Sequence, residues 1–222
     1  DLYKIQLYHR SQKMSNVSAA YVIKSGGVGI IYPFGGIMDY AFHFYNSMAE
    51  TGIMMALEKC LGETDAPPVV LCIGSDLAVG DSLGPITGTM LRRRPEFRGF
   101  VYGTLNAPVT AKEVKYINNF LKKTHPFSKI IAVDAAVGED SDVGLVKVSN
   151  QPLRPGSGAN KRLGKVGDVS ILGIVAKKSS FSYSVLNLTR LNVVYSMAQT
   201  ISDALSALSS LKKHDLPKSV NE

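Results

Sequence analysis

The chain of 222 residues has 45% hydrophobic and 19% charged side chains and a formal net charge of +7 at pH 7. This balance excludes a disordered chain and predicts one α/β domain with short terminal additions. The positive charges are scattered and lack interleaved aromatic residues, so nucleic acid is not expected as a partner. No apolar run reaches the roughly 18 residues that span a bilayer, and no signal peptide precedes the domain. We therefore expect a cytoplasmic protein that does not act at a membrane.

The first part of the chain is predicted to hold a leader, a hairpin and a helix. Two apolar runs around Gly26-Gly27 predict paired extended segments within residues 17–32. Apolar residues at helical spacing predict a helix over residues 38–61. Along the whole chain we expect a tag or disordered leader, a single α/β domain and a flexible tail, at residues 1–16, 17–212 and 213–222.

The rest of the chain alternates apolar strands with helices. Strands are predicted at residues 69–73, 100–103, 129–133, 143–148 and 169–176. Helices are predicted at residues 85–94, 110–123 and 183–211, the second with a capping box of Thr110 and Glu113. This alternation is typical of a three-layer α/β/α sandwich with a mostly parallel sheet.

Two aspartates follow apolar runs that are typical of buried strands. Asp81 lies in a glycine-containing loop after residues 69–73, and Asp134 comes directly after the strand at residues 129–133. Because the carboxyl ends of parallel strands meet in one crevice, we expect the two carboxyl groups to lie side by side. Such a pair can share a proton and perform acid–base chemistry, so Asp81 and Asp134 are the candidate catalytic residues.

Each aspartate also has a structural interpretation. Asp81 precedes a predicted helix, where a carboxylate can cap backbone N–H groups, and the same geometry would keep it ionised as a base requires. Asp134 has small neighbours and few local partners, so partial burial and a second carboxylate would raise its pKa. For Asp134, catalytic and structural roles both stay open at this point. Asp76, in the Asp81 loop, is interpreted as a turn residue.

Two glycine-rich loops are candidates for binding a substrate. The loop at residues 156–162 is interpreted either as a nest of backbone N–H groups for an oxyanion or as a flexible connection between strands. The candidate substrate-binding residues of both loops are Gly74, Ser75, Asp76, Gly156, Ser157, Gly158 and Asn160. The sequence contains neither a P-loop nor a Gly-x-Ser-x-Gly elbow, so a serine triad is not expected.

Three motifs in the same order carry a resemblance to known proteins. They are Gly80-Asp81-Ser82-Leu83-Gly84-Pro85, Ala132-Val133-Asp134-Ala135 and Pro155-Gly156-Ser157-Gly158. They resemble the Asp-Ala-Leu-Gly-Pro loop, the Ala-Ile-Asp-Ala strand end and the Pro-Gly-Ser-Gly loop of the bacterial spore germination protease. By these motifs the chain resembles the YyaC-like sporulation proteins, a domain family of unknown function. That family is similar to the germination protease and to hydrogenase maturation endopeptidases.

The resemblance implies a phosphorylase/hydrolase-like, germination-protease-like fold and an aspartic-type peptidase with Asp81 and Asp134 as its catalytic pair. It also implies a protein or peptide substrate, such as small acid-soluble spore proteins, and a location that includes the forespore. Maturation endopeptidases hold a metal with two acids at these motif positions and a later histidine. Residues 179–184 contain no histidine, so we expect neither a metal nor another cofactor.

Two further functions remain open. The first is a non-catalytic sporulation scaffold or regulator that uses the basic surface or the long C-terminal helix. Burial of that helix against a second subunit would produce a homo-oligomer. The second is a metal-dependent endopeptidase of the maturation type.

The basic run at residues 92–94 is interpreted as a solvated face at a helix end, which the helix dipole favours.

Overall fold

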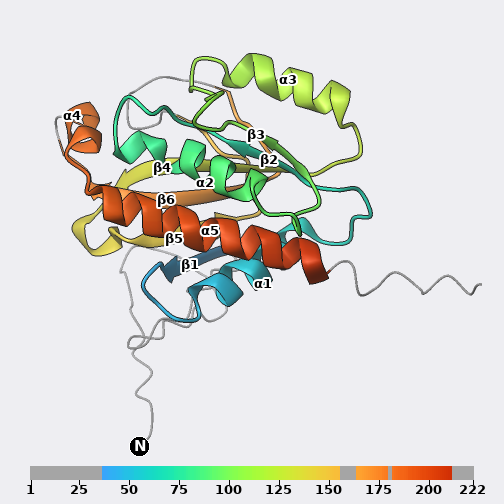
Figure 1. Ribbon diagram of the computed structural model, residues 1–222, viewed down its shortest axis with the longest axis horizontal. Helices are drawn as coiled ribbons and strands as arrows, with labels where there is room; N and C mark the ends of the chain where they lie inside the picture. The colour runs from blue at the N-terminus through green and yellow to red at the C-terminus, as the bar shows by residue number, and fades with distance from the viewer. Residues whose placement is uncertain (1–36, 156–163, 180–181, 212–222) are drawn as a thin grey trace, which may run out of the picture.

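The computed structural model describes residues 37–155, 164–179 and 182–211 (Figure 1). Its strands are β1 (Asp39–His43), β2 (Val69–Cys72), β3 (Phe100–Tyr102), β4 (Ile130–Gly138), β5 (Leu145–Ser149) and β6 (Val169–Lys177). Its α-helices are α1 (Ala49–Leu61), α2 (Leu83–Arg92), α3 (Val114–Thr124), α4 (Ser182–Asn187) and α5 (Leu191–Leu211). Two 3₁₀ turns are η1 (Gly80–Ser82) and η2 (Asp140–Asp142). The leader, the hairpin predicted within residues 17–32, and the tail at residues 213–222 lie outside the described residues.

The strands form one mixed sheet in the order β1-β5-β6-β4-β2-β3. The pairs β6–β4, β4–β2 and β2–β3 are parallel, whereas β5 is antiparallel to both β6 and β1. The strand β5 is therefore the one that runs against the other described strands. The prediction of a mostly parallel α/β sheet is confirmed.

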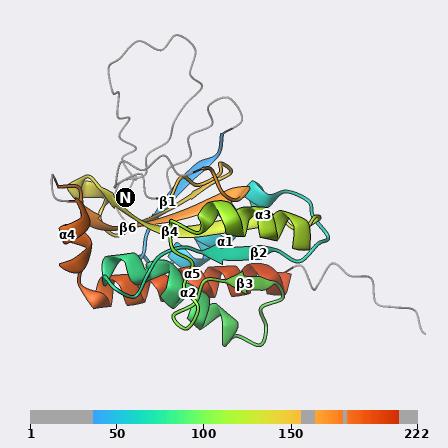
Figure 2. The same ribbon diagram turned by 90° about the horizontal axis from the view of Figure 1, so that it is seen from above.

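Helices cover both faces of the sheet (Figure 2). On one face α1, α2 and α5 share a large core with alternate strand residues such as Ile131 and Val133 of β4. On the other face α3 packs over a smaller core that includes Ile130 and Ala132. Because side chains alternate along a strand, Asp134 has its Cβ on the α3 face. The expected three-layer arrangement is thus present.

The helix predicted over residues 38–61 is wrong in its first part. Residues 39–43 form β1, which pairs with β5 from Asp39↔Ser149 to His43↔Leu145, and the helix begins only at Ala49. The side chains of Tyr40 and Phe42 are buried, whereas their neighbours are more exposed, which is the alternation of a strand. Aromatic residues at positions 40, 42, 44 and 45 fit the spacing of a strand as well as that of a helix. The segment forms a strand because a partner strand is available beside it.

The helix predicted over residues 183–211 is also wrong, because the chain breaks it into α4 and α5. The last turn of α4 is closed by the Leu188 N–H and the Thr189 hydroxyl, which both donate to the Val185 carbonyl oxygen at 3.1 and 3.2 Å. The apolar face of α5 is buried within its own chain against α1 and α2, with Met197 and Ile201 fully inaccessible. The burial of this helix therefore requires no second subunit.

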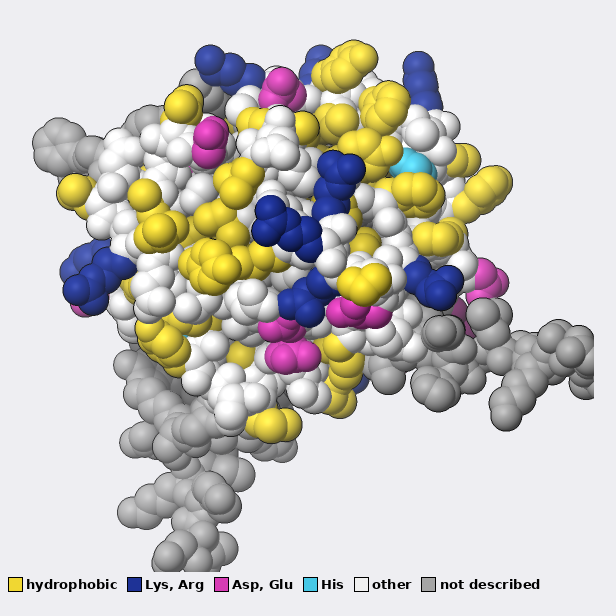
Figure 3. Space-filling view, viewed as in Figure 1, with side chains coloured by type: hydrophobic (Ala, Val, Ile, Leu, Met, Phe, Trp, Pro, Cys, Tyr) yellow, Lys and Arg dark blue, Asp and Glu magenta, His cyan; other side chains and the backbone are white. Residues whose placement is uncertain are grey.

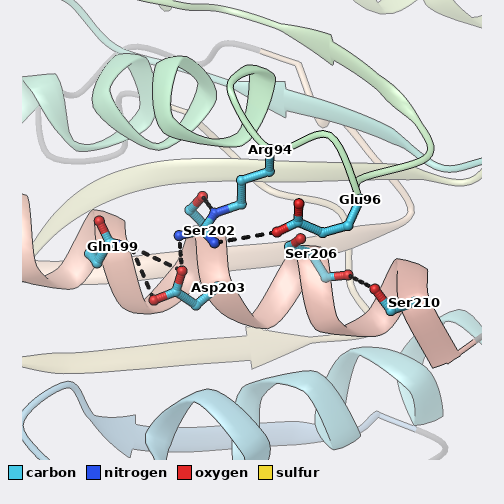
Figure 4. A network of polar contacts seen from close by, with 7 residues as sticks. All are labelled: Arg94, Glu96, Gln199, Ser202, Asp203, Ser206 and Ser210. Atoms are coloured by element: carbon cyan, nitrogen blue, oxygen red, sulfur yellow. Dashed lines mark hydrogen bonds and ion pairs between the residues drawn. The ribbon is translucent and has the colours of Figure 1, made fainter.

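A polar network fastens the segment after α2 to α5 (Figure 4). Arg94 forms an ion pair with Asp203, donates from Nε to the Ser202 hydroxyl at 3.1 Å, and lies 3.6 Å from the Glu96 carboxylate. Gln199 donates to both carboxylate oxygens of Asp203, at 2.9 and 3.1 Å. The guanidinium of Arg94 thus contacts three side chains of the protein.

None of the helices in the described part of the chain has the length and hydrophobicity that crossing a membrane requires.

Candidate acid site

The loop that carries Asp81 folds back onto the end of β2. Gly74 has a φ of 142°, and a Cβ at this position would overlap the carbonyl oxygen of Asp81. The Ser75 N–H donates to that same carbonyl oxygen at 3.2 Å. Only glycine fits a left-handed conformation with a backbone group at this distance. The glycine after the strand therefore explains how Asp81 returns to the edge where β2 ends.

A second glycine holds α2 against the same strand end. A Cβ on Gly84 would overlap the carbonyl oxygen of Ile73, so the first turn of α2 contacts the backbone directly. The N-cap residue of α2 is Ser82, and no side-chain hydrogen bond caps this helix. The interpretation of Asp81 as the helix cap is therefore wrong.

Asp134 lies inside β4 and not behind its last residue, so the predicted strand end at residue 133 is wrong. The strand continues because β6 continues beside it, with Asp134 opposite Leu172. On the other side, the ladder of β4 with β2 stops at the pair Cys72↔Val133. Asp134 is thus the first residue of β4 beyond its pairing with β2, at the level where the Asp81 loop begins.

The two carboxyl groups interact electrostatically. Burial raises the pKa of Asp134 well above its usual value, and the charge of Asp81 raises that pKa further. The Ala135 N–H, which donates to Oδ1 of Asp134 at 2.9 Å, opposes the shift. Burial also raises the pKa of Asp81, and the Ser75 N–H opposes it. Because Asp134 is 7% exposed and Asp81 is half-buried, Asp134 is the member that keeps its proton longer as pH rises.

The helix α4 and the residues that follow it also lie beside this site. Leu186 of α4 and the following Thr189 lie against Gly80 in the turn that carries Asp81, and a Cβ on that glycine would be 2.8 Å from each. Within the described ranges, no group of three or more His, Cys, Asp or Glu side chains is arranged to hold a metal ion.

The predicted substrate-binding residues fall into two sets. In the first loop, the Gly74 N–H donates to the Val109 carbonyl oxygen at 3.0 Å. Together with the Ser75 bond above, this commits the backbone N–H groups of two predicted substrate-binding residues to carbonyl oxygens of the protein itself. Asp76 is exposed, and the turn beside it is held by the Leu77 N–H, which donates to the Ser75 hydroxyl at 3.1 Å. The second set, Gly156, Ser157, Gly158 and Asn160, lies outside the described residues.

The described residues that flank this second set lie on the α3 face of the sheet. Leu153 and Val166 pair with each other through hydrogen bonds of 2.9 Å in both directions. Both are buried in the small core on the α3 face, together with Ala132. The two ends of the glycine-rich segment therefore lie on the face of β4 that carries Asp134.

Neither Asp81 nor Asp134 lines either of two large open cavities in the described part of the chain. One of about 720 Å³ lies between the end of β6 and α4 and is lined by Lys177, Lys178, Ser179 and Val185. The other, of about 710 Å³, runs along β3 beside the C-terminal end of α2.

Comparison with known proteins places these residues in a family. Residues 41–204, which include both Asp81 and Asp134, match the family described as "Protein of unknown function (DUF1256)". The chain belongs to this family. It is also 42% identical over 157 residues to the "Uncharacterized protein YyaC" of Bacillus subtilis (strain 168), which covers 71% of this chain and 75% of the relative. The resemblance to the YyaC-like family is confirmed, whereas the likeness to peptidases stays a prediction.

The electrostatic coupling in this family member can be measured directly. In an Asp81→Asn variant the pKa of Asp134 is expected to fall, because the neighbouring charge is removed. It should stay above 3.8, because burial is the larger cause. The measurement is a carbon-13 NMR titration of the aspartate carboxyl groups, with Asp76→Asn, in the same loop but exposed, as the control. An unchanged Asp134 titration in Asp81→Asn would show that the two groups do not interact.

Proposed function

We propose that this protein is a sporulation-associated peptide hydrolase of aspartic type, with Asp81 and Asp134 as its catalytic pair. One observation carries the proposal: two aspartates from different loops and strands interact, and their unequal burial separates them into an acid and a base. The resemblance to the germination protease supports a protein or peptide substrate, with small acid-soluble spore proteins as the first to be tested. It also supports the cytoplasm or the forespore as the location.

The unequal pair assigns a role to each carboxyl group. Asp81, which is half-buried and ionises first, takes a proton from a water molecule as the water oxygen attacks the scissile carbonyl carbon. Asp134, which keeps its proton, donates it to the carbonyl oxygen, so that a neutral tetrahedral diol forms. The proton on Asp81 then passes to the leaving nitrogen, the C–N bond breaks, and a hydroxyl proton returns to Asp134. Each group ends in the form in which it began.

This assignment predicts a bell-shaped dependence of hydrolysis on pH. As pH increases, activity rises when Asp81 loses its proton and falls when Asp134 loses its proton. The two apparent pKa values of this profile are properties of the coupled pair. Because burial raises both pKa values above 3.8, the rising limb should lie above that pH. Rates measured across the range on one peptide substrate test the shape.

The test of the function is a digestion assay with casein and with small acid-soluble spore proteins. Wild type is compared with Asp81→Asn and Asp134→Asn, and Asp65→Asn is the matched control because it changes an exposed aspartate outside both predicted substrate-binding loops. We expect wild type and the control to cleave and both catalytic variants to lose about 10²–10⁴-fold in rate. Equal cleavage by all four proteins would remove the catalytic assignment.

A non-catalytic scaffold or regulator is the second candidate. It is favoured by the 7% exposure of Asp134 and by the absence of either aspartate from the two cavities of the described residues. In that case no protein would be cleaved, and the two asparagine variants would change only stability. The metal-dependent alternative is separated by metal analysis of the purified protein, because its metal content would fall in both variants.

A further inference from the structure

The strand β3 leaves one side of the sheet without a partner. It is the last strand in the order of the sheet, and no other strand of the described chain pairs with its outer side. The Phe100 N–H donates inward, to the Pro68 carbonyl oxygen at 2.9 Å. Because successive residues of a strand direct their amides to opposite sides, the N–H and C=O of Val101 are directed outward. Such an edge can add an extended peptide.

A groove of about 710 Å³ runs beside this edge. Its walls are the C-terminal end of α2, the strand itself and the loop over residues 104–109. The loop is fastened to α2 by the Leu105 N–H, which donates to the Thr89 hydroxyl at 2.9 Å, so the wall is held in place. At its far end the groove includes Val109, whose carbonyl oxygen accepts the Gly74 N–H of the Asp81 loop.

The groove contains one arginine that has no ion pair among the described residues. This residue is Arg92, which is exposed, whereas Arg94 is already paired with Asp203. Arg93 and Arg98 are exposed close by in the sequence. In Figure 3 dark-blue basic side chains gather near the middle of the face, beside yellow hydrophobic ones. An arginine with a free guanidinium can bind a carboxylate through two parallel hydrogen bonds.

We propose that an extended, acidic peptide segment docks in this groove, with its main chain paired to Val101 and one of its carboxylates on Arg92. The main-chain pairing gives the segment its direction, and the charge selects its side chains. This docking goes beyond the proposed function, because it requires neither Asp81 nor Asp134. If hydrolysis also occurs, the groove would deliver a segment toward the loop that carries Asp81.

The charge requirement is tested by fluorescence anisotropy with a fluorescein-labelled peptide of alternating glutamate and valine. A peptide of alternating lysine and valine is the control probe. We expect wild type to bind the acidic peptide, and Arg92→Glu to bind it about tenfold more weakly or worse. Arg93→Glu, which makes the same change of charge one residue outside the groove, should keep nearly the wild-type affinity. Equal loss in both variants, or equal binding of both peptides, would overturn the proposal.

The pairing requirement is tested by blocking the backbone on each side. Val101→Pro removes the outward N–H at a sheet edge, where proline is tolerated, and its melting curve verifies that it is folded. This variant, and an acidic peptide with N-methyl groups on alternate residues, should each bind about tenfold more weakly. If Val101→Pro instead converts a dimer to a monomer in light scattering and leaves peptide binding unchanged, a second copy occupies the edge and the proposal fails.

The outcomes also separate docking from hydrolysis. All binding is measured on wild type and on Asp134→Asn, in which cleavage is not expected. Binding by both proteins without any cleavage supports the groove and contradicts the proposed function. Cleavage by a wild-type protein that binds the acidic peptide no better than Arg92→Glu and Val101→Pro supports hydrolysis and contradicts the groove.

Discussion

Asp134→Asn is expected to be more stable than wild type at pH 7 and yet to have lost peptide hydrolysis. In the fold the buried carboxyl group favours its neutral form, because burial and the charge of Asp81 both raise its pKa. Asparagine has nearly the same shape, is neutral at every pH, and can keep its oxygen as the acceptor of the Ala135 N–H. It cannot donate a proton to a scissile carbonyl oxygen, so function is lost without loss of structure.

The sign of the pH dependence follows from the direction of the shift. In the unfolded chain Asp134 titrates near 3.8, and in the folded protein it titrates well above that value. Between the two, the folded state holds more protons than the unfolded state. The stabilising contribution is therefore complete below about pH 4 and is lost as pH rises through the folded pKa. Each unit by which the folded pKa of Asp134 exceeds the unfolded pKa is equivalent to about 1.4 kcal/mol. At neutral pH the free energy of unfolding of Asp134→Asn should exceed that of wild type by about this amount per unit.

Urea unfolding of the two proteins at a series of pH values measures this difference. The free energy of unfolding should diverge in favour of Asp134→Asn as pH increases from 4 to 7. The exposed Asp76→Asn variant should stay within about 0.5 kcal/mol of wild type throughout. A constant difference between Asp134→Asn and wild type would mean that Asp134 is ionised in the fold, and the roles assigned to the pair would be untenable.

Gly84→Ala is expected to lower the free energy of unfolding by about 3 kcal/mol. The added methyl group would overlap the carbonyl oxygen of Ile73, which is backbone and cannot rotate away. The gain in helix propensity from glycine to alanine, about 1 kcal/mol, only partly offsets this overlap. Because α2 follows the Asp81 turn directly, displacement of the helix would also move Asp81 away from Asp134.

Thermal unfolding followed by circular dichroism measures the effect. A loss of about 3 kcal/mol in a chain of this length lowers the Tm by about 10 °C. Gly164→Ala is the matched control, because nothing lies within 4 Å of a Cβ at that position. If Gly84→Ala melts with wild type, the close contact between α2 and the end of β2 does not exist in solution.

The sequence predicted the parts of the fold that local pattern determines. The run at residues 69–73 is fully apolar, as is typical of a strand covered on both faces. The buried strand β2 confirms this prediction. Asp81 and Asp134 could be singled out because each follows such a run. Their interaction depends on the neighbouring places of β2 and β4 in the sheet, which strand order decides and local pattern does not encode.

Where prediction failed, a distant partner decided the structure. Residues 39–43 form a strand only because β5 lies beside them, more than a hundred positions further along the chain. Asp134 lies within β4 because β6 extends the ladder past it. The Thr110 capping box is half correct: Glu113 accepts the Thr110 N–H at 2.8 Å, but the helix begins at Val114. At the break between α4 and α5, Leu186 and Thr189 pack against Gly80. The helical spacing of apolar residues could not predict this long-range contact.

The position of β6 has a consequence for how the protein is made. Among the described residues it is the last strand to be synthesised, yet it lies in the interior of the sheet and joins β1 and β5 to β4, β2 and β3. Until it has left the ribosome, β4 has an open edge, and the antiparallel pair of β1 and β5 has nothing to attach to. The sheet therefore cannot close until β6 has been synthesised, and the nascent chain is most exposed to aggregation before that point.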